Sequence, residues 1–189
     1  DLTFAPFAAP WTDDPDEALL AGFARGSGDA HELWLGTARG GIWRRKLGRW
    51  ENFKPVGVKG SWQVLGFAEQ IDASGRAWLW AASDRGLARW DGERWTLTPR
   101  SLGLTPGMRA LTIIREGERD VLWASSNWQG VVRVDVSDPL DPVRLGDDGY
   151  RIPTPAEDDW ERTRQGPRAP RPGEPHRLHT DALVSFWQP

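Results

Sequence analysis

Short apolar runs separated by polar, glycine-rich turns follow one another along most of the chain. In the middle of the chain they predict four consecutive strands, at 62–70, 77–82, 86–90 and 93–98. The second run is almost wholly apolar, as expected for a strand that is buried on both faces. Asp91-Gly92 separates the last two strands and predicts a type I′ hairpin turn, in which both central residues need a positive φ.

The same pattern occurs three times in register. A Leu-Trp pair opens each copy, and small residues, a glycine and an arginine follow it. Trp34 and Trp80 are 46 residues apart, and Trp80 and Trp123 are 43 apart. A period near 45 residues with tryptophan in a fixed place is typical of a four-stranded propeller blade. These three tryptophans are therefore predicted to pack between neighbouring blades.

The flanking units give the same succession of strands. The predicted strands are 18–24, 32–37, 41–46 and 49–53 in the first unit, and 109–115, 120–126, 130–136 and either Val143 or 150–152 in the third. A further unit is predicted to begin within 178–189, and residues 2–7 could form the outer strand of a preceding blade. A β-sandwich with tryptophan-rich strands is the alternative, but sandwiches do not repeat a five-residue motif in register three times.

We therefore predict an all-β chain, a β-propeller fragment of about three four-stranded blades plus the first strand of a further blade. Within residues 1–189, the predicted parts are blades at 18–53, 61–98 and 109–152, a Pro/Arg-rich loop at 153–177 and the start of the next blade at 178–189. Three blades do not close a propeller, which needs about 4–8. The ring is expected to be completed by missing sequence or by other copies of the chain.

Composition narrows the class of protein. A chain of 189 residues suits one domain, and a net charge of -3 disfavours a general nucleic-acid binder. The absence of cysteine excludes disulfides, zinc-thiolate sites and a thiol nucleophile. No apolar run reaches the ~18 residues of a transmembrane helix, so the chain is not expected to span a membrane itself. Asp1 is followed by no apolar leader, so a signal peptide is expected to be absent or already removed.

The first unit carries Leu33-Trp34-x-Gly36-Thr37, then Gly41-Ile42-x-Arg44, then Gly48-x-Trp50-x-x-Phe53. This unit resembles the two-component-regulator propeller repeat. The other units depart from it. Ala82 and Ser125 stand where the first unit has Gly36, and Ser83 and Ser126 stand where it has Thr37. The resemblance covers about residues 18–135, with a weaker echo at 178–188.

The resemblance implies a periplasmic or extracellular sensor propeller of a bacterial hybrid histidine kinase or diguanylate cyclase. Such a module would bind a small ligand, including an oligosaccharide, and relay the event to a downstream signalling domain. A propeller repeat specifies the fold much more tightly than it specifies the ligand. A self-assembling propeller lectin and a protein-interaction scaffold remain alternative functions at this stage.

No motif for catalysis, a metal or a cofactor is found, so neither an enzyme nor a cofactor is predicted. The three histidines, His31, His176 and His179, lie in turn-like or proline-rich surroundings, as do the acidic clusters at 13–17 and 157–159. These residues are interpreted as solvated loop residues. The segment 72–78 approaches the sialidase Asp box but has the wrong spacing.

Four residues in the loops between the second and third strands of the units are the candidate ligand contacts: Arg39, Arg85, Asn127 and Trp128. In a propeller these loops lie on the same face as the connections between blades, which is the usual ligand entrance. A flat indole with guanidinium and amide donors suits a sugar or an acidic small molecule. The alternative is that these are ordinary solvated loop residues. The loop at 153–177 is expected on the same face, as a lid or a partner-docking loop.

Overall fold

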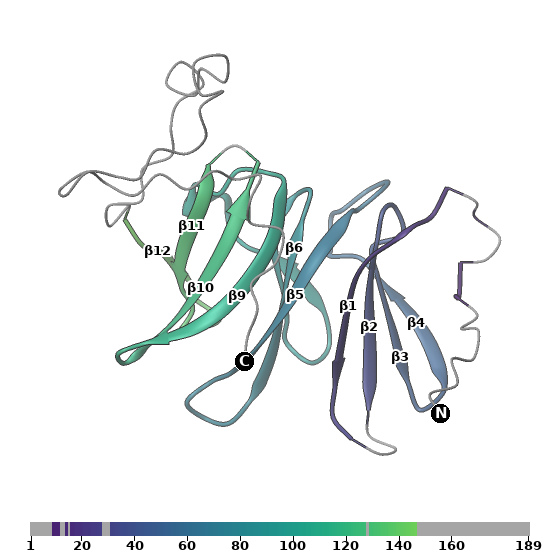
Figure 1. Cartoon of the computed structure of the whole chain (residues 1–189), viewed down its shortest axis with the longest axis horizontal. Helices are drawn as coiled ribbons and strands as arrows, with labels where there is room; N and C mark the ends of the chain where they lie inside the picture. Colours follow the sequence, from purple (N-terminus) through teal and green to yellow (C-terminus); the bar gives the residue numbers. More distant parts are fainter. Residues whose placement is uncertain (1–8, 12–13, 15, 28–30, 128, 147–189) are drawn as a thin grey trace, which may run out of the picture.

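The computed structural model describes residues 9–11, 14, 16–27, 31–127 and 129–146. Apart from a short 3₁₀ turn at Arg100–Leu102, the regular structure of these residues is all β. Twelve strands form three separate antiparallel sheets, each with its four strands in chain order (Figure 1). The predicted loop at 153–177, the predicted further blade at 178–189 and the strand suggested at 2–7 lie outside the described residues.

Each sheet is one of the predicted blades. Blade 1 contains β1 (Leu19–Arg25), β2 (Glu32–Thr37), β3 (Ile42–Lys46) and β4 (Arg49–Phe53). Blade 2 contains β5 (Val64–Ile71), β6 (Ala77–Ser83), β7 (Gly86–Trp90) and β8 (Trp95–Leu97). Blade 3 contains β9 (Met108–Glu116), β10 (Arg119–Ser126), β11 (Gly130–Asp135) and β12 (Val143–Arg144). The all-β propeller fragment is confirmed, and the fourth strand of blade 3 is the one predicted near Val143.

Neighbouring blades contact each other through their first strands, β1 with β5 and β5 with β9 (Figure 1). The rings of Phe23 in β1 and Phe67 in β5 lie 6.5 Å apart. Gly66 in β5 lets β9 approach, because a Cβ at this position would lie 3.0 Å from the Leu111 side chain. The three described sheets form no closed ring, as expected for a fragment with three blades.

An aromatic core fills the space between blades 1 and 2. Trp34 of β2 is fully buried and meets Trp90 and Trp95 of blade 2 edge-on, with ring centroids 5.2 and 5.8 Å away. The guanidinium of Arg44 lies 5.2 Å from the Trp34 ring and 5.4 Å from the Trp90 ring. Trp62 is also fully buried in this core. Edge-to-face rings and a stacked guanidinium stabilise the contact beyond the area they bury.

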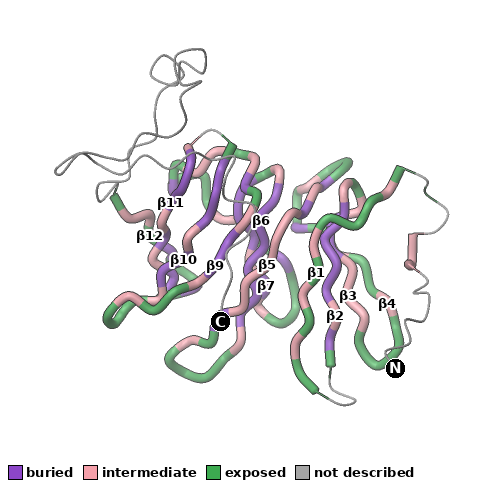
Figure 2. The backbone as a smooth tube through the Cα atoms, in the orientation of Figure 1, coloured by how far each residue is buried: buried purple, intermediate pink, exposed green. Residues whose placement is uncertain are grey.

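The core between blades 2 and 3 is mainly aliphatic. Trp80 of β6 is fully buried there among Leu87, Met108, Leu122 and Val134. Strand β6 is buried on both faces, because its alternate residues enter the two different cores (Figure 2). This confirms the prediction made from its continuous apolar run.

The repeated tryptophans each donate their indole N–H to a polar side chain of their own blade. Trp34 donates to Glu32 at 3.2 Å, and Trp123 donates to Glu116 at 2.6 Å. Trp80 donates to Gln70, which is itself buried, at 2.9 Å. Packing between blades is confirmed for Trp34 and Trp80, whereas Trp123 is half-buried in the last described blade.

Gly36 explains why the first unit has glycine where the others have Ala82 and Ser125. A Cβ at Gly36 would lie 2.7 Å from the Val64 carbonyl oxygen and 2.8 Å from the Val64 side chain. Blade 2 therefore approaches blade 1 too closely at this point for any side chain, which makes glycine a packing requirement of this interface.

The predicted type I′ turn at Asp91-Gly92 is wrong. A type I′ turn needs a positive φ at both central residues. Gly92 has a φ of 105°, but Asp91 does not have a positive φ, since Leu47 is the described non-glycine residue that does. The Asp91 carboxylate instead accepts the backbone N–H groups of Glu93 and Arg94, both at 2.9 Å, which produces a wider turn. Aspartate suits this position because its side chain binds the backbone of the turn, and no positive φ is needed there.

Candidate functional site

The first strand of each blade begins, and its second strand ends, at the same end of the molecule. We call this the loop end. Its described residues are those of the loops between second and third strands, at 38–41, 84–85, 127 and 129, together with the linkers between blades, at 54–63 and 98–107. Arg39, Arg85 and Asn127 of the predicted ligand residues lie on these loops.

Backbone hydrogen bonds join the loop end from blade to blade. The Trp62 N–H donates to the Arg39 carbonyl at 2.9 Å, which links blades 1 and 2. The Gly107 N–H donates to the Asp84 carbonyl, and the Asn127 N–H donates to the Gly107 carbonyl, both at 3.1 Å. The loops that were predicted to share one face are therefore connected through their main chains.

Hydroxyl side chains close two of these loops from within. Thr37 donates its hydroxyl to the Gly41 carbonyl at 3.1 Å, and Ser83 donates to the Gly86 carbonyl at 2.7 Å. Both hydroxyl residues are buried. The threonine-to-serine change between the repeats thus preserves the hydrogen bond that closes the loop.

Arg39 is exposed and faces carboxylates of blade 1. Its guanidinium lies 2.7 Å from the Asp16 carboxylate, and its own N–H donates to the Glu17 carboxylate at 2.8 Å. Gly40 donates a second N–H to Glu17 at 2.5 Å. The charge of Arg39 is therefore balanced within its own blade.

Arg85 is exposed and has neutral acceptors. Its guanidinium donates to the carbonyl oxygens of Ser61, at 3.2 Å, and Lys59, at 3.4 Å. Both acceptors lie in the linker that leads into blade 2. Arg85 therefore holds that linker through neutral acceptors, and its remaining N–H groups belong to the same anchored guanidinium.

Asn127 is exposed and orients a second arginine. Its Oδ1 accepts a hydrogen bond from the guanidinium of Arg109, the second residue of β9. Trp128, the fourth predicted ligand residue, lies outside the described residues. The structure thus brings Arg39, Arg85 and Asn127 to one end of three adjacent blades.

Lys54 in the first linker and Arg109 at the start of β9 also lie at the loop end, and the Arg144 guanidinium reaches it at the Gly103 carbonyl. None of the three was predicted from the sequence. They occupy different positions of the repeat, so no alignment of the three units brings them together. The sequence signal for a basic region was the segment 54–59 of the first linker, which begins and ends with lysine. That this segment lies next to Arg85 depends on how blades 1 and 2 pack against each other.

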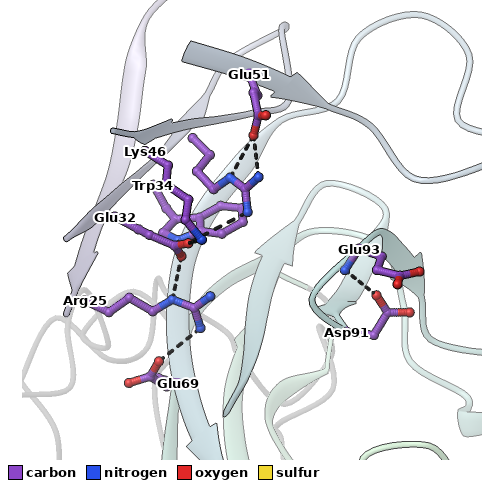
Figure 3. A network of polar contacts seen from close by, with 9 residues as sticks. Arg25, Glu32, Trp34, Lys46, Glu51, Glu69, Asp91 and Glu93 are labelled. Atoms are coloured by element: carbon purple, nitrogen blue, oxygen red, sulfur yellow. Dashed lines mark hydrogen bonds and ion pairs between the residues drawn. The ribbon is translucent and has the colours of Figure 1, made fainter. Parts of the chain in front are cut away.

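A second polar cluster lies between blades 1 and 2 at the opposite end (Figure 3). Glu32 is almost fully buried and accepts ion pairs from Arg25 and Lys46, each at 2.8 Å. Arg25 extends to Glu69 of blade 2 at 3.2 Å. Burial opposes ionisation of Glu32, but the hydrogen bonds from Lys46 and Arg25 outweigh it and hold its pKa below the ordinary value. All its charges are paired, so this cluster joins blades rather than binding a ligand.

The described residues contain no group of three or more His, Asp or Glu side chains that could hold a metal ion. None of the helical structure in the described residues is long and apolar enough to cross a membrane. The chain matches no protein-family model, no curated protein and no solved structure. Function must therefore be inferred from the chemistry of the loop end.

Proposed function

We propose that the chain is the ligand-sensing module of a receptor, and that its loop end binds a small molecule or an oligosaccharide. One observation carries this proposal. Exposed hydrogen-bond donors from three adjacent blades, on Arg39, Arg85 and Asn127, lie at one end that continuous backbone hydrogen bonds join together. Amide and guanidinium donors on loops that backbone hydrogen bonds anchor suit the hydroxyl and carboxylate oxygens of such a ligand.

The signalling part of the proposal follows from the resemblance of the repeat to the two-component-regulator propellers. On that reading the module acts in the periplasm or outside the cell, and a downstream domain receives the signal. Ligand binding would favour one arrangement of blades or protomers over another, because a ligand shifts an equilibrium through its different affinities for the two states.

A self-assembling lectin is the weaker alternative, because it predicts equivalent binding residues in every blade. Arg39 pairs with a carboxylate, Arg85 with backbone carbonyls, and Asn127 with another arginine. The three loops therefore differ in chemistry, which favours one composite site over three equal ones.

An array of neutral and acidic oligosaccharides tests the proposal. The full chain is expected to bind at least one member, and Asn127→Ala is expected to weaken that binding about tenfold, as for loss of an interaction of about 1.4 kcal/mol. Arg94→Gln, at an exposed arginine on the opposite end, is the matched control and is expected to bind normally. If no member is bound, or if both variants behave alike, the loop end is not the site.

A further inference from the structure

The cations at the loop end of blades 2 and 3 are held by neutral oxygen atoms. The Lys54 ammonium donates to the Gly60 carbonyl at 2.8 Å. Arg85 donates to backbone carbonyls of the same linker, and Arg109 donates to the side-chain amide of Asn127. The Arg144 guanidinium donates to a carbonyl of the second linker, that of Gly103, at 2.8 Å. Each cation is thus positioned without being neutralised.

Several cations elsewhere in the described residues have carboxylate partners. At the opposite end, Lys46 lies 2.8 Å from Glu32 and Arg115 lies 2.8 Å from Asp120. At the loop end of blade 1, Arg39 pairs with Asp16. Arg76 and Arg89 are held differently, because Arg76 donates to the Asp91 backbone carbonyl and Arg89 lies over the Trp78 ring. The loop end of blades 2 and 3 is distinguished by the number of such cations that gather there, although the whole chain has a net charge of -3.

Carboxylates are scarce in this region. Asp84 is the acidic residue at the described loop end of blades 2 and 3, and its side chain accepts the Gln63 N–H at 3.1 Å. The other described carboxylates of the loop end, Asp14, Asp16 and Glu17, precede β1 and belong to blade 1. Positive charge therefore dominates the loop end of blades 2 and 3.

Arg85 and Arg109 lie on neighbouring segments of the main chain. The backbone hydrogen bond between Gly107 and Asp84 joins the residue next to Arg85 with a residue two positions from Arg109. Both side chains are exposed. Each guanidinium is anchored by its own hydrogen bonds, so it loses little freedom when it binds a negatively charged ligand. The planar fork of arginine matches the two oxygens of a carboxylate or a sulfate.

We propose that the loop end of blades 2 and 3 selects ligands that carry several oxyanion groups, with Arg85 and Arg109 as the principal contacts. The inference rests on the proposed function and specifies the chemical class of its ligand. Carboxylate and sulfate groups share the required chemistry, and the experiment separates them.

Calorimetric titration of the full chain tests this selection. The probes are tetragalacturonate, which carries carboxylates, a chondroitin sulfate tetrasaccharide, which also carries sulfate, and a neutral galactose tetrasaccharide of the same length. At least one acidic probe is expected to bind about tenfold more tightly than the neutral one, and to weaken as ionic strength rises. The acidic probe that binds more tightly identifies the preferred oxyanion.

Variants assign that binding to the two arginines. Arg85→Gln and Arg109→Gln are each expected to weaken acidic binding about tenfold, whereas Arg94→Gln at the opposite end leaves it unchanged. Arg85→Lys keeps the charge but loses the planar fork, so it is expected to bind more weakly than the unmodified chain and more tightly than Arg85→Gln. A thermal melt of each variant identifies those that remain folded, and affinities are compared among these.

Three results would overturn the inference, and they separate it from the proposed function. If the neutral and acidic probes bind equally, and Asn127→Ala weakens both, the loop end binds ligands without selecting charge. If the acidic probe binds but neither glutamine variant weakens it, the charge selection lies elsewhere. If neither these probes nor any array member binds, the proposed function itself fails.

Discussion

Truncation of Trp80 is the most direct test of how the blades are held together. Trp80 is fully buried between blades 2 and 3, and its indole N–H donates to the buried Gln70 at 2.9 Å. Trp80→Ala removes a large side chain from a packed core, which costs about 3–5 kcal/mol in comparable cases. It also leaves the Gln70 side-chain oxygen without its donor, at a further cost of about 1 kcal/mol.

The expected loss in the free energy of unfolding is therefore about 4–6 kcal/mol. The Gln70 amide keeps its own donated bonds, to the Val136 carbonyl at 2.6 Å and to Asp120 at 3.3 Å, so the second contribution stays at the low end. A loss of this size is a large part of the roughly 5–15 kcal/mol that stabilises a domain. Trp80→Ala should consequently unfold at a much lower urea concentration than the unmodified chain.

Urea unfolding followed by circular dichroism measures the loss, with two variants as controls. Trp80→Phe keeps most of the ring volume and is expected to lose about half as much. Trp123→Ala removes the same repeat residue from a half-buried position, so it should also lose less than Trp80→Ala. If Trp80→Ala lost under about 1 kcal/mol, or Trp123→Ala lost more than it, the assignment of Trp80 to a blade interface would be refuted.

Three further predictions concern single turns. Gly41→Ala should destabilise the chain by about 2–4 kcal/mol in a urea titration, because φ is 87° and a Cβ would lie 2.7 Å from the Phe53 carbonyl; Gly48→Ala, where φ is 76° but the space is open, should lose less. Leu47→Asn should stabilise the chain by about 0.5 kcal/mol, because Leu47 is 72% exposed and has a φ of 48° that asparagine tolerates better. An unchanged melting temperature would contradict this. Hydrogen bonds from Ser74 and Trp78 lower the pKa of Asp72 from 3.8 to about 2. The stability that the Asp72 carboxylate provides is therefore present above about pH 4 and is lost as pH falls through about 2, so an NMR titration of Asp72 with a midpoint near 4 would refute the assignment.

Strand positions could be predicted closely from the sequence because each depends on local signals. The apolar run of β6 and the repeated Leu-Trp pairs give bounds within a residue or two of the structure. The wide turn at Asp91 could not be predicted, because a two-residue and a four-residue turn both accept Asp-Gly. Their difference depends on the Asp91 carboxylate, which bonds to the backbone of Glu93 and Arg94.

The location of the candidate site could be predicted from the sequence, but the partners of its charged side chains could not. The repeat put Arg39, Arg85 and Asn127 on equivalent loops, and the structure brings those loops to one end. Equivalent loops nevertheless hold different environments, because Arg39 meets Asp16 whereas Arg85 meets carbonyl oxygens of a linker. Such partners come from segments more than 20 residues away, and no local pattern encodes them.

The sequence by itself determined the strands, the three-fold repeat and the tryptophans that join the blades, because periodicity and repeated packing residues are local properties. Only the tertiary structure decided which loop-end cations have a carboxylate partner and which have backbone carbonyls instead. It did so through the contact of each blade with the linker before it, where Gly103 receives Arg144 of blade 3 and Ser61 receives Arg85 of blade 2. Electrostatic pairing depends on distance in space, and that distance is fixed only when the blades pack.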